Sequence, residues 1–308
     1  MQRIVACVPN FSEGRRVEVI EALAGEVRRT QGVFLLDVSW DPSHHRCVLT
    51  FVGEPEAVKQ AAFASAARAV ELINMEEHRG VHPRIGAVDV IPFVPLANVT
   101  MAECVALAKD LGREIWEKLG VPVYLYAEAA QRPERRRLPE IRRGEYEGLK
   151  ETISLPERHP DIGEPRLHPT AGATVVGARR PLIAFNVYLS TGDVVVAKNI
   201  ARAVRESSGG LVNVQARGVR IEHRGIAQVT MNLLDPVRTP LPRVFELVLA
   251  EAARYGVEVV ESEIVGLVPL DALVEIARHY LRIHRFSREK VLDARLLELL
   301  GVQLVRWE

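Results

Sequence analysis

The order of its predicted strands and helices constrains the fold of this chain more than any other feature. Short apolar segments typical of strands, and longer segments with the i, i+3, i+4, i+7 spacing of amphipathic helices, follow one another as strand, helix, strand, strand, helix, strand. In the first half these segments are residues 3–8, 15–30, 33–38, 46–52, 55–74 and 88–95. The same order returns in residues 182–189, 192–207, 212–222, 226–234, 241–255 and 257–264. Because βαββαβ is the order of the ferredoxin-like unit, we predict an α+β fold with two ferredoxin-like subdomains.

A stretch dense in proline and glycine separates the two halves. Residues 155–180 contain Pro156, Pro160, Pro165, Pro169, Gly163, Gly172 and Gly177. Proline and glycine interrupt regular structure, so this stretch is predicted to be an irregular connector. The predicted subdomains are therefore residues 1–178 and 179–308.

Further elements are predicted outside the two repeats. Thr100 and Glu103 have the spacing of a capping box, which predicts a helix from residue 101 to about 119. The others are a strand at 121–126, an arginine-rich helical segment at 128–150, and two terminal helices at 270–283 and 287–300.

Composition limits the class of protein. Forty basic and 40 acidic residues give a formal net charge of zero, which argues against broad binding to nucleic acid or to a membrane surface. No apolar run reaches the roughly 18 residues of a membrane span, and the apolar N-terminal segment is too short for a signal peptide. Three cysteines are an odd number without metal-ligand spacing, so we expect a reducing, cytoplasmic environment.

The residues best suited to chemistry lie in the stretch 78–90. It carries His78 and His82 and is interrupted by Gly80, Pro83 and Gly86, so it is predicted to be a loop between two rigid elements. Loops of this kind often carry functional side chains, although a solvated connector is the plain alternative. The i, i+4 spacing of the histidines resembles a helical zinc pair, but the glycines and the proline disfavour a helix.

Three other stretches are weaker candidates for a site. The predicted turn at 41–46 carries His44, His45 and Arg46, which could contact a metal or a ligand or simply face solvent. The small residues of 172–179 lack the Gly-x-Gly-x-x-Gly spacing and indicate close approach of a flat ligand or of another backbone segment. A third stretch is a cluster of arginines with interleaved glutamates. This pattern favours a solvent-exposed face with salt bridges over a binding site for a polyanionic tail. The arginines are Arg132, Arg135, Arg136, Arg137, Arg142 and Arg143.

Several motifs occur together and in order, and their combination resembles the glutamate formimidoyltransferase (formiminotransferase) family along nearly the whole chain. They are CVPNFSEG at 7–14, HPRIGAVDV at 82–90, PVYLY at 122–126, GEYE at 144–147, GAT at 172–174, GAR at 177–179, NLLD at 232–235 and VGLVPL at 265–270. The resemblance implies two subdomains with a ligand tunnel between them. It implies transfer of a formimino group from N-formimino-L-glutamate to N5 of tetrahydrofolate, in histidine degradation, with tetrahydrofolate as co-substrate and no metal.

The resemblance also implies roles for individual residues. The family's catalytic histidine matches His82. Its folate-binding segment matches Gly163, Glu164, Pro165, Arg166, Leu167, His168, Pro169, Thr170, Ala171, Gly172 and Thr174. The expected substrate-binding residues are Asn10, Glu13, Asp37, Arg46, Arg84 and Asp89. A homodimer is expected, with the apolar second half as its interface.

These residues suggest a mechanism. The reaction must remove one proton from N5 and deliver one to the departing nitrogen, and an imidazole with an ordinary pKa near 6.5 can do both. Asp37, Asp89 or Glu13 could face the amidinium, and Arg46 and Arg84 could bind the two carboxylates of glutamate.

Three alternatives stay open at this point. Ala6 and Ser39 replace acidic residues expected from the resemblance, so the chain could transfer a formyl group instead, or bind folate without activity. A metal-dependent hydrolase using His44, His45, His78 and His82 is the third.

Overall fold

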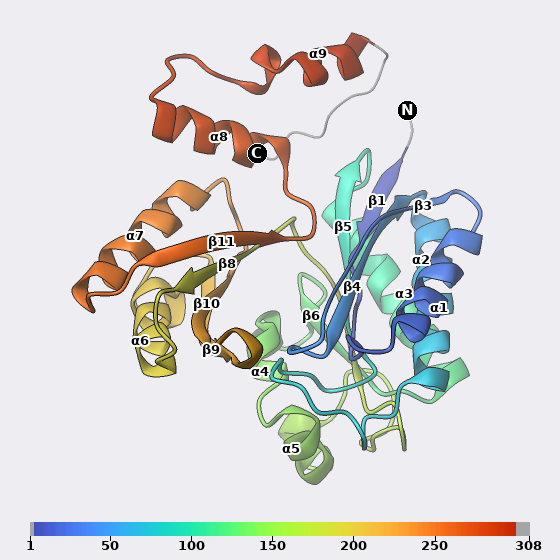
Figure 1. Ribbon diagram of the computed structural model, residues 1–308. Coiled ribbons are helices and arrows are strands. Elements are labelled where there is room, and N and C mark those ends of the chain that lie inside the picture. The colour runs from blue at the N-terminus through green and yellow to red at the C-terminus, as the bar shows by residue number, and fades with distance from the viewer. Residues whose placement is uncertain (1–2, 300–308) are drawn as a thin grey trace. The chain divides into compact units, whose positions relative to one another are not determined.

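The computed structural model describes residues 3–299 and divides the chain into two compact units that meet in sequence between Arg179 and Arg180 (Figure 1). Each unit has its own sheet, with seven strands in the first unit and four in the second. Each also has its own buried apolar core. The predicted α+β class with two sheets in two units is therefore confirmed.

The first unit is built on the seven-stranded sheet. Its strands are β1 (Ile4–Cys7), β2 (Asn10–Phe11), β3 (Val33–Asp41), β4 (Arg46–Gly53), β5 (Val88–Ala97), β6 (Val123–Ala127) and β7 (Thr174–Ala178). Both β1 and β2 lie between β4 and β5 and are antiparallel to both, so they are two pieces of one strand interrupted at Val8 and Pro9. Strand β3 pairs with the outer edge of β4, and β7 and then β6 add in parallel beyond β5.

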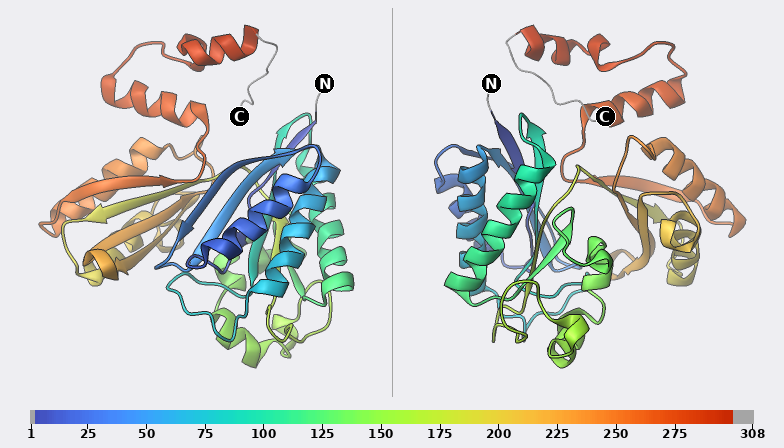
Figure 2. Two further views of the ribbon diagram at one scale, coloured as in Figure 1. Left: turned by 45° about the vertical axis from the view of Figure 1, so that its right-hand side comes forward. Right: turned by 180° about the vertical axis from the view of Figure 1, so that it is seen from behind.

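Helices cover the two faces of this sheet unequally. The long helices α1 (Val17–Arg29), α2 (Pro55–Leu72) and α3 (Met101–Leu119) lie along one face (Figure 2). Alternate strand residues point to opposite faces, and Ile91 packs in the same cluster as these helices while Val90 belongs to another. The other cluster contains residues of the short helices α4 (Leu138–Ile141) and α5 (Glu145–Thr152).

The start of α3 confirms the capping-box prediction. The Thr100 side chain accepts a hydrogen bond from the backbone N–H of Glu103, and the Glu103 side chain accepts one from the backbone N–H of Thr100. These bonds satisfy backbone donors that a helix start would otherwise leave unpaired. The helix runs from Met101 to Leu119, and Gly120 ends it with φ at 65°.

Two predictions for the first unit are wrong. The segment 155–180 is not irregular throughout, because its residues Thr174–Ala178 form the fully buried strand β7. A Cβ atom on Gly177 would lie 2.4 Å from the Tyr126 backbone oxygen, so the glycine is there to let the two strands approach. The segment 128–150 is not one helix: it contains a 3₁₀ turn at Pro133–Arg136, the helix α4 and the start of α5.

The second unit follows the predicted order closely. Its elements are β8 (Ile183–Leu189), α6 (Val194–Val204), β9 (Val214–Ile221), β10 (Ile226–Leu233), α7 (Leu241–Arg254), β11 (Val259–Val265), α8 (Leu270–Leu281) and α9 (Leu292–Leu299). The four strands are antiparallel in the order β11-β8-β10-β9, and α6 and α7 pack on the sheet through its core. The last helix predicted from the sequence includes residue 300, which lies outside the described residues. None of the described helices is long and apolar enough to cross a membrane.

Candidate active site

The loop that follows α2 carries His78 and His82 and is joined by its backbone to the segment before β7. The N–H of Ala87 donates to the carbonyl of Ala171 at 2.8 Å. A Cβ atom on Gly86 would lie 1.9 Å from the Ala173 backbone oxygen, and Gly172 adopts φ of +72°, which favours glycine. The small residues near 172 are predicted to allow close approach of a flat ligand or of another backbone segment. The structure shows another backbone segment at Gly172.

The turn between β3 and β4 supports the same loop from another side. Gly80 lies against this turn so closely that an added Cβ atom would be 2.6 Å from the carbonyl oxygen of His44. The N–H of Val81 donates to the carbonyl of Ser43 at 3.4 Å. The two histidine-bearing stretches predicted as separate candidates are therefore one structural unit.

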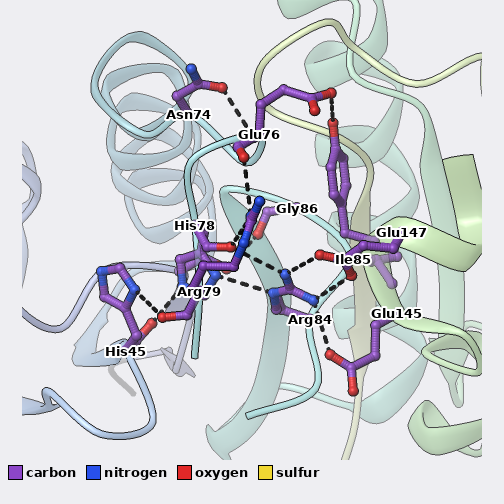
Figure 3. A network of polar contacts seen from close by, with 12 residues as sticks. His45, Asn74, Glu76, His78, Arg79, Arg84, Ile85, Gly86, Glu145 and Glu147 are labelled. Atoms are coloured by element: carbon purple, nitrogen blue, oxygen red, sulfur yellow. Dashed lines mark hydrogen bonds and ion pairs between the residues drawn. The ribbon is translucent and has the colours of Figure 1, made fainter. Parts of the chain in front are cut away.

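Two histidines join these stretches by stacking. The His45 and His78 rings lie 4.2 Å apart between centroids and are within 10° of parallel (Figure 3). The Nδ1 atom of His78 accepts a hydrogen bond from Nε of Arg84 at 3.1 Å, so its proton is on Nε2, which donates to the His45 carbonyl at 2.9 Å. Burial lowers the pKa of His78 from 6.5 to about 4, and the neighbouring charges of His45 and Arg84 act in the same direction. His78 is therefore a neutral structural histidine at pH 7.

His45 in turn connects the loop to a buried carboxylate. Its Nδ1 atom lies 3.0 Å from the Arg79 carbonyl oxygen and its Nε2 atom 3.2 Å from Oε1 of Glu13. Glu13 is 1% exposed and also accepts hydrogen bonds from the backbone N–H groups of Arg15 and Arg16 at the start of α1. Burial acts to raise the pKa of Glu13, but these hydrogen bonds outweigh it, and the pKa lies far below its usual range. Glu13 is thus ionised and anchors the β3–β4 turn.

Arg84 is occupied by protein groups on all sides (Figure 3). It is 5% exposed, and its Nε donates to His78 Nδ1. Its Nη1 donates to Glu145 at 2.9 Å and to Glu147 at 2.8 Å, and its Nη2 donates to Glu147 at 2.6 Å and to the His78 carbonyl at 3.4 Å. These are all five N–H donors of a guanidinium group. The predicted contact between Arg84 and substrate stays a prediction, and it would require one of these bonds to break.

An open pocket lies beside this network. Its volume is about 480 Å³, and it is lined by Arg79, Gly80, Arg84, Gly144, Glu145 and Glu147. Both charge signs are present in its wall.

His82 lies at a second group of charges in the same unit. Its Nε2 atom is 2.5 Å from Nη1 of Arg46, and its ring is 6.2 Å from that of His44. Because a guanidinium can only donate, Nε2 of His82 is the acceptor and the ring carries its proton on Nδ1. Burial and the like charge of Arg142 lower the pKa of Arg46 to about 10, although Asp89 and Asp41 oppose this shift.

Asp89 and Arg142 complete this group. Asp89 is 1% exposed, its Oδ1 accepts the backbone N–H of Ile85 at 2.9 Å, and its Oδ2 accepts a hydrogen bond from Nη2 of Arg142. The Nε atom of Arg142 is buried without a hydrogen-bond partner. Sequence reasoning missed Arg142, because charge pattern alone does not distinguish it from the five neighbouring arginines of its cluster.

The arginine cluster is only partly a solvent face, so that prediction needs correction. Arg143 is exposed and pairs with Glu140, as predicted. Arg142 is mostly buried, and Arg135 is 4% exposed, pairs with Asp161 at 2.6 Å and lies over the ring of Tyr124. Two of the six arginines are therefore largely buried and paired with buried carboxylates of the first unit.

The other predicted site residues lie on neighbouring elements of the first unit. The Asn10 amide on β2 donates to the Val8 carbonyl at 3.1 Å. Asp37 lies on the edge strand β3, and its Oδ2 atom is buried without a partner, as is Oγ of Ser39 two residues on.

The segment predicted to bind folate changes from exposed to buried along its length. Gly163, Glu164, Pro165, Arg166, Pro169 and Thr170 are exposed, Leu167 and His168 are half-buried, and Ala171, Gly172 and Thr174 are buried. Within residues 3–299 no group of three or more His, Cys, Asp or Glu side chains could hold a metal ion.

Comparison with known proteins gives matches that cover nearly the whole of this chain. The N-terminal subdomain of the formiminotransferase domain matches residues 4–179, and the formiminotransferase domain matches residues 184–303. The chain is 45% identical to the glutamate formimidoyltransferase of Streptococcus pyogenes serotype M1, over 96% of this chain and 100% of that one. It is 47% identical to the protein of the same name from Thermoplasma acidophilum, over 95% and 97%. It is 48% identical to the formimidoyltransferase-cyclodeaminase of Gallus gallus over 92% of this chain, which is 53% of that protein.

Proposed function

The chain belongs to the formiminotransferase family, and we propose that it is a glutamate formimidoyltransferase. It transfers the formimino group of N-formimino-L-glutamate to N5 of tetrahydrofolate and yields 5-formiminotetrahydrofolate and glutamate. The observation that carries this proposal is the high identity, over the full length of both chains, to two relatives that bear this name. The reaction belongs to histidine degradation and one-carbon metabolism.

The surroundings of His82 suit it to move the proton. N5 of tetrahydrofolate attacks the amidine carbon, a tetrahedral adduct forms, and the bond from that carbon to the glutamate nitrogen then breaks. We propose that the His82 imidazole takes the N5 proton and returns it to the leaving nitrogen. The Arg46 guanidinium holds Nε2 of His82 as an unprotonated acceptor. When the substrate binds to Arg46 in place of His82, Nε2 of His82 loses its hydrogen bond to Arg46 and can accept the N5 proton.

The remaining predicted residues keep supporting roles in this proposal. Asp89 orients Arg142 and lies close enough to act on Arg46, whereas Glu13 fixes the turn that carries Arg46. Asn10 and Asp37 stay predicted substrate-binding residues, and Gly163 to Gly172 with Thr174 stay the predicted folate-binding segment. Its exposed half offers contact surface and its buried half is fixed to the His82 loop.

We propose the ferredoxin-like topology for both units. The order β3-β4-β1/β2-β5 in the first unit and β9-β10-β8-β11 in the second, antiparallel throughout, support it. The domain boundaries at 178 and 179, the folate tunnel, the homodimer, the absence of a metal and the cytoplasmic location stay predictions from the sequence.

The test is a transfer assay on the purified full chain with tetrahydrofolate and either N-formimino- or N-formyl-L-glutamate. We expect transfer from the formimino donor. We expect His82→Ala to lower turnover by roughly 10²–10⁴-fold and to keep folinate binding, because it removes the proton carrier alone. His223→Ala, at an exposed position of the second unit, is the matched control. Transfer from the formyl donor only, folinate binding without transfer, or near-normal single-turnover rates in His82→Ala would each contradict the proposal.

A further inference from the structure

The donor in the proposed reaction carries two carboxylates, and the inference that follows rests on that reaction. Arg46 and Arg84 are the arginines predicted to bind them. Arg84, however, is buried and gives all five of its N–H donors to His78, Glu145 and Glu147. A bidentate contact with a substrate carboxylate needs two of these donors. The structure therefore favours another arginine close to His82.

Arg142 lies near Arg46, the arginine that contacts His82. It directly follows helix α4, and its guanidinium reaches the buried carboxylate of Asp89 on β5. Arg142 and Asp89 both act electrostatically on Arg46, whose Nη1 atom touches His82. Three stretches distant in sequence thus place Arg142 and Asp89 near Arg46, the residue that contacts the imidazole.

One donor in this group is left without an acceptor. The like charge of Arg142 contributes to the lowered pKa of Arg46, which Asp89 and Asp41 oppose. The Nε donor of Arg142 is buried without a partner, which is costly in the absence of an acceptor. An arriving carboxylate would supply the missing acceptor.

We propose that Arg142 is a substrate-binding residue that acts with Arg46 to hold one carboxylate of the glutamate moiety next to His82. Asp89 positions Arg142 by fixing its Nη2 atom, and the Nε donor turns to the substrate. Arg84 is then a positioning residue, which secures the loop against α5 and does not contact the donor.

The experiment compares wild type with Arg142→Met, Arg142→Lys and the control Arg143→Met. Arg143 is the adjacent residue, its side chain is 76% exposed, and its salt bridge is to Glu140 at the surface. Steady-state KM is measured separately for N-formimino-L-glutamate and for tetrahydrofolate. Binding of N-formimino-L-glutamate and of its two monoamides, each with one carboxylate replaced by a carboxamide, is measured by calorimetry.

We expect Arg142→Met to raise the KM for the formimino donor roughly 10- to 100-fold, the usual effect of losing a charge-assisted hydrogen bond, with the KM for tetrahydrofolate unchanged. Arg142→Lys keeps the charge beside Asp89 and should show a smaller rise, which keeps the test usable if the Met variant does not fold. One monoamide should bind wild type and Arg142→Met equally, and it identifies the carboxylate that Arg142 holds.

Equal losses for the diacid and for both monoamides would mean a structural role and overturn the inference, as would an unchanged KM in both Arg142 variants. Failure of the proposed function has a different signature. Wild type would then transfer no formimino group, while calorimetry would still show whether a dicarboxylate binds in an Arg142-dependent way.

Discussion

Acidification from pH 7 to pH 5 is expected to remove about 2 kcal/mol of stability through His78 alone. The folded chain keeps this imidazole neutral because it is buried and stacked on His45, and its pKa lies at about 4 against 6.5 for a free side chain. Between these two values the unfolded chain binds a proton that the folded chain does not. The contribution is therefore complete above pH 6.5 and is lost as the pH falls towards 4, where the loss of stability amounts to about 3 kcal/mol.

The assay is urea unfolding of the full chain at both pH values, followed by circular dichroism. The test variant is His78→Gln, since glutamine can accept from Arg84 and donate to the His45 carbonyl but does not titrate. His159→Gln, at a half-buried histidine of the same unit, is the control. Differences between wild type and each variant cancel the titration of all other groups.

Between pH 7 and pH 5 the free energy of unfolding of wild type should fall by about 2 kcal/mol more than that of His78→Gln. The fall for wild type and for the control His159→Gln should be about equal. If wild type and His78→Gln lost equal stability, burial would not be holding this imidazole neutral, and the reasoning would be refuted.

Three further predictions concern stability. Gly86→Ala should abolish soluble expression or lower the melting temperature sharply, because its Cβ atom would lie 1.9 Å from the Ala173 backbone oxygen; a normal melting curve would contradict this. Arg135→Met should cost about 3–5 kcal/mol in chemical unfolding because it leaves Asp161 buried without its cation, and the double variant with Asp161→Asn should recover part of the loss. Thr100→Ala should cost about 1 kcal/mol in the same assay by removing the cap of α3.

The elements that local patterns specify could be predicted closely. Helix α3 begins where the capping box places it and ends at a glycine, and both signals are contained in a few neighbouring residues. The strands of the second unit are within two residues of their predicted ends, because each is long enough to show its apolar pattern. Strand β7 was missed since it is short and follows a stretch rich in proline and glycine. Its pairing with β5 and β6 comes from distant parts of the chain.

In the candidate site, too, features set by nearby residues could be predicted and features set by distant residues could not. His82 and Arg46 could be proposed as candidates, His82 from its match to the family's motif and Arg46 from its predicted turn, and the structure brings them into contact. The hydrogen bonds that occupy Arg84 and the burial of Arg142 could not be predicted, because both depend on partners far away in sequence. The partner is Glu147 for Arg84 and Asp89 for Arg142. Burial decides which arginines of a cluster matter, and it is a property of the folded chain.

The contact between Gly86 and Gly172 leaves no room for a side chain between the loop that carries His82 and the segment proposed to receive folate. Intervening side chains could absorb a small displacement by changing rotamer, whereas two backbones in contact shift together. A pterin that binds to the segment and displaces it would therefore displace the loop that carries the imidazole as well. In such an arrangement each of the two substrates would change the affinity for the other.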